Sequence, residues 1–236
     1  SGNTAVTKLA VSNSGQAVTF TDIGGIDLGS VDGVTGITAT TFNLTTSGAI
    51  TNSVASTISG VTTLVAGAGN DITLDNASNA FGTVLVTSGK DVVLVDTDAI
   101  TLGASTISGT LDVTAGGILT IGGAVGATGG ATTLTANAMA IGAALDGTGQ
   151  IVTLKPADSS TAINLGTGTG ALDLTNTEID YITATTLRIG ADDASTGAIT
   201  VSSDITPANT ATLHLRTPST ITGTDGGIIE TNLALT

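Results

Sequence analysis

The sequence predicts an all-β protein, a right-handed parallel β-helix (solenoid) of about 11 coils with little or no α-helix. Three observations predict this fold: short apolar–x–apolar triplets alternate with glycine-containing turns, the triplets recur after roughly 20 residues, and large side chains are scarce. Only 2% of the residues are aromatic and 10% are charged. Such a chain can fill a narrow core of Val, Ile, Leu and Ala, which a coiled strand provides, but not the thick core of an ordinary globular domain.

The first 40 residues already show short alternating strands separated by Ser-Gly, Asp and Gly-Gly turns, as expected for the first coils. These strands are centred on Leu9/Val11, Val18/Phe20 and Ile26/Leu28.

From Phe42 onward, one triplet of each coil can be followed to the end of the chain, with a mean spacing of about 21 residues. The predicted series is Phe42/Leu44, Leu64/Ala66, Val84/Val86, Leu111/Val113, Leu134/Ala136, Val152/Leu154, Leu172/Leu174, Leu187/Ile189, Leu213/Leu215 and Leu233/Leu235. The step from Leu172 to Leu187 is too short for a full coil, so the register is open between residues 172 and 190.

The repeat is clearest between residues 64 and 121, where second triplets follow turns containing Gly69, Gly89 and Gly116. These second triplets are Ile72/Leu74, Val92/Leu94 and Leu119/Ile121. Because side chains alternate along a strand, the outer members of each triplet are expected to point inward and the middle residue outward.

Two alternatives to the β-helix are a helix at residues 134–145 and an antiparallel meander or sandwich. The segment LTANAMAIGAAL is the nearest approach to a helical pattern, but Gly142 and the surrounding alternation favour strand. Tight hairpins prefer Asn-Gly or Asp-Gly loops, and only Asp32-Gly33 and Asp146-Gly147 offer them. The sandwich remains the less favoured alternative.

Residues 1–236 are therefore interpreted as a single solenoid domain. The sequence starts Ser1–Gly2–Asn3–Thr4, without Met or a leader pattern, which suggests the shaft portion of a longer chain or a fibre subunit. Solenoid ends expose strand edges, and no cap is visible at either end, so end-to-end self-association or continuation into neighbouring repeats is expected.

Composition excludes several classes of protein. Mean hydropathy is +0.45, which disfavours disorder. Thr, Ser, Asp or Gly interrupts every apolar run, so we expect that the protein is not membrane-embedded. The net charge is −14, from 17 Asp and 2 Glu against five cations that are scattered along the sequence: Lys8, Lys90, Lys155, Arg188 and Arg216. We therefore expect no nucleic-acid partner. No Cys is present, so disulfides and thiolate metal sites are excluded.

Asp71 and Asp91 lie 20 residues apart before equivalent triplets, so they should be neighbours on successive coils. Two ionised carboxylates that close repel unless a cation or Lys90 offsets them, although two solvated turn residues are the simpler interpretation. The string AGAGNDITL (66–74) is similar to a calcium-binding nonapeptide, but Thr73 occupies its apolar position and no tandem copy follows. We predict no metal site and no cofactor.

No catalytic motif is visible, and we predict that the protein is not an enzyme. His214 stands between Leu213 and Leu215, which points it outward on a strand, and the Ser-His-Asp, P-loop and HExxH patterns are missing. A glycan-binding or glycan-cleaving β-helix enzyme is the alternative, because carboxylates are available but aromatic platforms are not. The candidate carboxylates are Asp192-Asp193, Asp91/Asp96/Asp98 and Asp22/Asp27/Asp32.

Ice binding is a lesser alternative, because it needs Thr-x-Thr rows stacked in register on a flat face. Such pairs do occur, but without one constant repeat: Thr133/Thr135, Thr167/Thr169 and Thr175/Thr177. Thr is also the ordinary polar residue of a strand that faces water.

The segments GNDITLDNASNAFGTVLVTSGKDVVLVDTDAITLG and GTLDVTAGGILTIGG resemble the repeats of filamentous-haemagglutinin-like exoproteins, the secreted partners of two-partner secretion systems in Gram-negative bacteria. The resemblance is clearest from Gly67 to Gly123. The Asn-Pro signatures of that family's secretion domain are missing, since Pro156, Pro207 and Pro218 follow Lys or Thr. The resemblance implies a repeat shaft of an extracellular or cell-surface adhesive fibre that contacts a glycan or protein on a host or neighbouring cell.

Overall fold

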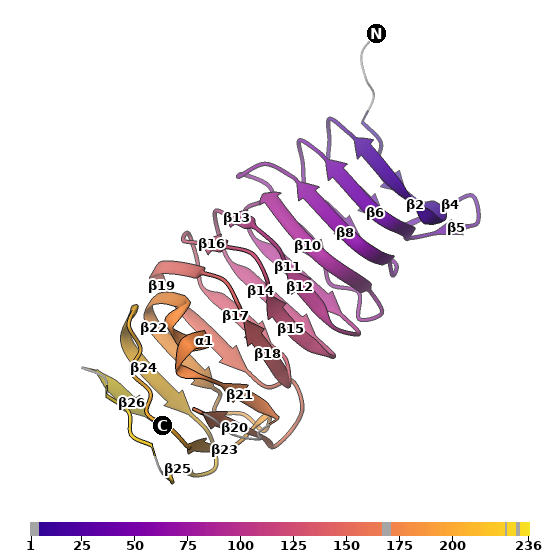
Figure 1. Ribbon diagram of the computed structural model, residues 1–236. Helices are drawn as coiled ribbons and strands as arrows, with labels where there is room; N and C mark the ends of the chain where they lie inside the picture. Colours follow the sequence, from indigo (N-terminus) through magenta and orange to yellow (C-terminus); the bar gives the residue numbers. More distant parts are fainter. Residues whose placement is uncertain (1–4, 167–170, 225, 230–231) are drawn as a thin grey trace.

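A computed structural model describes residues 5–166, 171–224, 226–229 and 232–236. The chain winds into an elongated β-solenoid of about 11 turns, which confirms the predicted all-β parallel architecture (Figure 1). Among the described residues the strands pair in parallel, except for one small antiparallel hairpin between β4 (Ser30–Val31) and β5 (Val34–Thr35).

Sheet 1 has 13 strands and runs along the whole rod. Its main path is β1 (Lys8–Leu9), β3 (Ile26–Leu28), β7 (Ile50–Asn52), β9 (Ile72–Leu74), β11 (Val92–Asp96), β14 (Leu111–Ala115), β17 (Thr132–Thr135), β19 (Leu145–Lys155), β22 (Ile182–Gly190), β24 (Thr210–Arg216) and β26 (Leu233–Leu235). Two further strands, β13 (Ser105–Ile107) and β16 (Val125–Ala127), join it at β19.

Two smaller sheets form other faces of the rod. Sheet 2 has seven strands, in the order β18 (Ala138–Ile141), β15 (Ile118–Ile121), β12 (Ile100–Leu102), β10 (Ala80–Ser88), β8 (Thr57–Val65), β6 (Ile37–Thr45) and β2 (Val11–Thr21). Sheet 3 has four strands, in the order β21 (Leu172–Leu174), β20 (Thr161–Leu165), β23 (Thr196–Val201) and β25 (Ile221–Gly223).

The core is narrow and aliphatic, as predicted. In β9 the side chains of Ile72 and Leu74 are fully buried, whereas Thr73 between them is partly exposed. Ile72 stacks on Ile50 of the previous turn and on Val92 of the next turn. Each turn thus buries its triplet against two neighbours, and this repetition stabilises the rod without a thick core.

The register of the predicted series is wrong between Val84 and Leu111. Leu111 stacks on Val92 in sheet 1, whereas Val84 stacks on Leu102 in sheet 2. Leu119 likewise continues from Ile100 and not from Val92. The physical reason is that three similar short strands lie between residues 92 and 107, and alternation alone does not say which sheet each strand joins.

The register is also wrong at Leu172/Leu174. These residues form β21, which pairs with β20 in sheet 3, and β19 instead pairs directly with β22. Val152 therefore stacks on Leu187, and the described part of residues 156–181 forms an excursion from sheet 1. The open register between residues 172 and 190 is closed by this pairing.

The excursion contains α1 (Asn176–Asp180), the one helix among the described residues. Thr175 caps its start: the Glu178 backbone N–H donates to the Thr175 hydroxyl, and the Glu178 carboxylate accepts from the Thr175 N–H at 2.9 Å. This reciprocal capping box explains why a short helix forms inside a strand-rich chain. The segment 134–145, the nearest helical pattern in the sequence, contains no helix, as predicted, and contributes to β17, β18 and β19 with turns between them.

In the described residues, no helix combines the length and the apolar content needed to cross a bilayer.

A buried polar corner joins three successive turns near the N-terminal half. The Asn79 side chain is fully buried, and its Oδ1 accepts from Asn52 Nδ2 at 2.7 Å and from the Ser56 N–H at 3.0 Å. Its Nδ2 donates to the carbonyl oxygens of Leu74 and Val95, at 3.2 and 3.3 Å. One buried amide therefore connects polar groups of three successive turns, and both of its ends are hydrogen-bonded.

Candidate functional site

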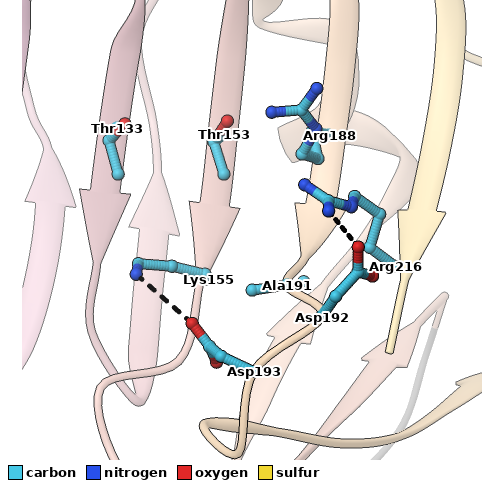
Figure 2. A pocket seen from close by; sticks show the side chains of 9 residues that line it. Thr133, Thr153, Lys155, Arg188, Ala191, Asp192, Asp193 and Arg216 are labelled. Carbon is cyan, nitrogen blue, oxygen red and sulfur yellow. Dashed lines mark hydrogen bonds and ion pairs between the residues drawn. The ribbon is translucent and has the colours of Figure 1, made fainter. Parts of the chain in front are cut away.

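An open groove of about 400 Å³ lies on the outer face of sheet 1, where β17, β19, β22 and β24 lie side by side (Figure 2). It is lined by Thr133, Thr153, Lys155, Arg188, Gly190, Ala191, Asp192, Asp193 and Arg216. None of these side chains is aromatic or large and apolar. The groove is therefore a charged and hydroxylated surface.

Strand alternation and register place these side chains together. Thr133 pairs with Thr153, Thr153 pairs with Arg188, and Arg188 pairs with His214 on the next strand. All four residues occupy the outward position between two buried neighbours. Lys155 lies two residues beyond Thr153, so it points to the same face of the sheet.

The segment after β22 forms the rim of the groove. Gly190 has a φ of +86°, and a Cβ at this position would lie 2.1 Å from the Arg216 carbonyl oxygen. Only glycine therefore allows the chain to turn so close to β24. The turn carries Asp192 and Asp193 over the sheet, and the Ala191 N–H donates to Thr196 Oγ1 at 2.9 Å.

Both rim carboxylates form ion pairs with cations of the sheet. Lys155 Nζ lies 3.8 Å from Asp193 Oδ2, and Arg216 donates to Asp192 (Figure 2). The Arg216 hydrogen bond lowers the pKa of Asp192, and hydrogen bonds from the side chain and backbone of Ser195 lower the pKa of Asp193. Both carboxylates are therefore ionised at neutral pH.

Arg188 is the exception among the groove cations. Within the part of the chain that the structure describes, its guanidinium has neither an ion pair nor a hydrogen bond, and its Nε is buried without a partner. His214, its neighbour in the row, has a pKa lowered by burial and by the nearby charges of Arg188 and Arg216. Arg188 therefore contributes a positive charge that the protein leaves uncompensated.

The sequence interpretation of five scattered cations is wrong for this region, because three of the five Lys and Arg residues line one groove. The outward orientation of His214 was predicted correctly, since it stands between the buried Leu213 and Leu215. Alternation already placed Lys155 and Arg188 on outward positions. What the sequence did not show is that β19 pairs directly with β22, which brings these cations together.

The second predicted feature, Asp71 beside Asp91, is present closer to the N-terminal end of the rod, directly before β9 and β11. Lys90 Nζ lies 2.6 Å from Asp91 and 3.7 Å from Asp71, so a single cation offsets both carboxylates. Asp91 also accepts from the N–H and the hydroxyl of Thr110. The Lys90 hydrogen bond is the largest of the effects that lower the pKa of Asp91 to about 2.

The remaining candidate carboxylates do not converge on a site. Asp22 accepts from the N–H groups of Val6 and Gly24, and Asp27 pairs with Lys8 at 3.2 Å. Asp96 is buried and accepts from the N–H groups of Phe81 and Asp98, and burial raises its pKa.

Two of the other candidate carboxylates sit at turns. Asp98 lies in the turn after β11, where its backbone N–H donates to Asp96 Oδ1. Asp32 occupies the β4–β5 turn with a φ of +49°. The sequence grouped these carboxylates by their closeness in the chain, and the structure places them at turns.

The nonapeptide-like string and the Thr pairs also have structural roles. Asn70 Nδ2 donates to the Ala66 carbonyl at 2.8 Å, which closes the turn before β9. No group of three or more potential metal-ligating side chains occurs in the described ranges. Of the Thr pairs, Thr175 caps α1, whereas Thr167 and Thr169 lie outside the described residues.

Thr133/Thr135 is the Thr pair that lies on a sheet. Its neighbours on the adjoining strands are Asp112/Thr114 and Thr153/Lys155, so the next strand on either side does not repeat the pair.

A family model described as repeats of unknown function (DUF5649) matches residues 2–88 and 89–155, which together make up more than half of the chain. No curated protein and no solved structure matches. The second match ends at Lys155, the last residue of β19 and the point where the excursion from sheet 1 begins. Arg188, Asp192, Asp193 and Arg216 therefore lie beyond the matched repeats, and the groove forms where the repeats meet the C-terminal part.

Proposed function

This chain belongs to the DUF5649 family of repeats, and we propose that it is a non-enzymatic structural and adhesive rod, exposed on or released from the surface of a Gram-negative bacterium. The observation that carries the proposal is the unbroken parallel ladder of sheet 1 from β1 to β26. A ladder of this kind spaces one end of a protein from the other and presents a long face to partners. The similarity of residues 67–123 to filamentous-haemagglutinin-like repeats supports the same role.

End-to-end self-association is part of the proposal. The last strand of sheet 1, β26, leaves Leu233 and Leu235 about half exposed, at 43% and 54%. An open strand edge beside exposed apolar side chains favours pairing with another strand. A second copy, or further repeats, would bury both the edge and these side chains.

The groove favours binding over catalysis. Glycoside hydrolysis needs one carboxylic acid held protonated beside a second carboxylate. Asp192 and Asp193 instead both have lowered pKa values, because each accepts hydrogen bonds and faces a cation. The glycan-acting alternative is therefore better supported as a binding surface than as an enzyme. An ice-binding face has less support, since Thr133/Thr135 is not repeated on adjacent strands.

Three measurements on purified protein test this proposal. Electron microscopy should show rods that lengthen with protein concentration, and protein-coated beads should adhere to a cell surface. Incubation with polysaccharides should release no reducing ends. Compact particles of constant length that leave beads non-adherent would contradict the rod and its adhesive role. Reducing ends released by the wild type but not by Asp192→Asn would contradict the absence of catalysis.

A further inference from the structure

We propose that the groove around Arg188 binds the carboxylate of an acidic glycan, a polymer of uronic acid units, laid across β17, β19, β22 and β24. This inference rests on the proposed adhesive role, for which it names the ligand class.

The charge balance of the groove selects an anion. Three cationic and two anionic side chains line it, which leaves one positive charge in excess among the lining residues of a protein of net charge −14. Asp112, which pairs with Thr133, lies outside this lining, and burial raises its pKa. Lys155 and Arg216 are neutralised by Asp193 and Asp192, so the excess resides on Arg188. At physiological ionic strength charges beyond about 8 Å are largely screened, so this local excess, and not the net charge, governs an approaching ligand.

The hydrogen-bonding capacity of the Arg188 guanidinium is also unused within the described part of the chain. It lines the groove together with the guanidinium of Arg216, and Figure 2 draws no interaction to Arg188 from the residues around it. Two like charges on one face repel each other, and Asp192 compensates only Arg216. A carboxylate bound at Arg188 would relieve that repulsion and accept two parallel N–H bonds from the guanidinium fork.

The two Asp side chains select a single negative charge over a more highly charged group. A phosphate or a run of phosphates would approach Asp192 and Asp193, which stay ionised at neutral pH because their pKa values are lowered. A carboxylate carries one negative charge and is planar, so it can meet Arg188 while keeping the rim carboxylates at a distance.

The rest of the lining favours a sugar over a protein. Thr133 and Thr153 present hydroxyl groups from neighbouring strands, which lie about 4.8 Å apart, in the row that continues to Arg188. Ring hydroxyls of a glycan can exchange hydrogen bonds with them. A protein partner would need an aromatic or large apolar anchor pocket at the centre of its interface, and the groove lining contains none.

The position of the groove on an open sheet face suits an extended polymer. The chain of the glycan can continue beyond the groove in both directions across the strands, because the sheet surface is not closed by walls. A single carboxylate site of this kind is expected to bind weakly, with Kd on the order of 1 mM, and to gain strength through repeated units and through stacked rods.

The test is titration of the full chain with a galacturonic acid trisaccharide, followed by calorimetry or by NMR. A neutral galactose trisaccharide is the matched ligand control. We expect the acidic ligand alone to bind, and its affinity to fall about 10-fold in Arg188→Gln, which keeps a hydrogen-bonding side chain but removes the charge. Arg188→Lys should lose roughly 3-fold, because an ammonium group retains the charge without the fork.

Lys8→Gln is the control variant, since it removes one positive charge from the far end of the rod. It should bind as the wild type does. The circular dichroism spectrum and melting temperature of each variant establish that it is folded, so loss of binding in a folded Arg188→Gln is attributable to the site.

Any one of four results would overturn the inference. The acidic trisaccharide does not bind at about 10 mM, or the neutral galactose trisaccharide binds equally well. The other two are an unchanged affinity of Arg188→Gln for the acidic trisaccharide, and a sulfated trisaccharide or a glutamate tripeptide that binds more tightly than the acidic trisaccharide. Because the titration uses isolated protein and a small ligand, it is independent of rod length and of bead adhesion. A failed inference is thereby distinguished from a failed adhesive role.

Discussion

Replacement of Asn79 by Ala should be among the most destabilising single substitutions in the N-terminal half. The fully buried amide makes four hydrogen bonds that connect three turns. Its removal leaves the Ser56 N–H and the carbonyl oxygens of Leu74 and Val95 without this partner. An unsatisfied buried polar group costs about 1–3 kcal/mol, so the expected loss is about 3 kcal/mol in the free energy of unfolding.

Asn79→Asp separates the loss of hydrogen bonds from the loss of volume, because the two side chains have nearly the same shape. The second carboxylate oxygen would face the Leu74 and Val95 carbonyl oxygens, where Nδ2 now donates. Burial and these oxygens raise the pKa of the introduced carboxyl in the folded state above its unfolded value. The penalty of this variant should therefore be smallest at low pH and grow as the pH rises through that raised pKa.

Urea unfolding followed by circular dichroism measures the global effect, and hydrogen exchange measures the local one. The Ser56 amide, which donates to Asn79 Oδ1 at 3.0 Å, should lose protection in Asn79→Ala. Asn43→Ala is the matched control, since the Asn43 amide makes one exposed contact of 3.4 Å and should change stability by less than about 0.5 kcal/mol. A loss in Asn79→Ala as small as that of the control, with Ser56 still protected, would refute the role assigned to this corner.

Two further predictions concern the other polar contacts. The pKa of Asp91 is lowered to about 2, chiefly by Lys90, so its contribution to stability is present above the unfolded pKa of 3.8 and is lost as the pH falls toward 2. With solvent screening this contribution is worth about 1 kcal/mol. The free energy of unfolding, measured against pH, should show this loss in the wild type but not in Asp91→Asn. Thr175→Ala removes the N-cap of α1 and should cost about 1 kcal/mol, measured as faster exchange of the Glu178 amide; unchanged exchange would argue against the capping box.

The fold was predictable because the local alternation of residues and the overall composition both indicate a β-solenoid. Alternating triplets predict which side chains are buried, and Ile72, Leu74, Val92 and Leu94 are all fully buried as expected. Scarce aromatic and charged residues limit the thickness of the core. Alternation is a property of a few neighbouring residues, so a change in the length of a turn does not alter it.

The register was not predictable in the same way, because it depends on long-range pairing. Val152 stacks on Leu187, which is 35 residues later, whereas neighbouring turns advance by about 20 residues. Leu172 and Leu174 carry the same triplet pattern but belong to sheet 3. A periodic pattern cannot distinguish a strand that continues one sheet from an identical strand that belongs to another.

The groove was missed as a consequence. Which outward residues are neighbours depends entirely on the register, and the expected series placed Asp173, not Arg188, beside Thr153. With the pairing of β19 and β22 known, Thr153, Arg188 and His214 form one row, and the cations of β19, β22 and β24 converge on it. The buried Asn79 was missed for a different reason, since a turn Asn is usually solvated and only the stacked turns enclose it.

The register that assembles the groove can be tested with introduced disulfides, because the chain contains no Cys. Neighbouring strands lie about 4.8 Å apart, within the Cα separations of about 4.4–6.8 Å that a disulfide spans. The account predicts that Thr153→Cys with Arg188→Cys forms an intramolecular disulfide under mild oxidation, whereas Thr153→Cys with Asp173→Cys does not. Cross-linking of the second pair and not of the first would contradict the pairing of β19 with β22, and with it the groove.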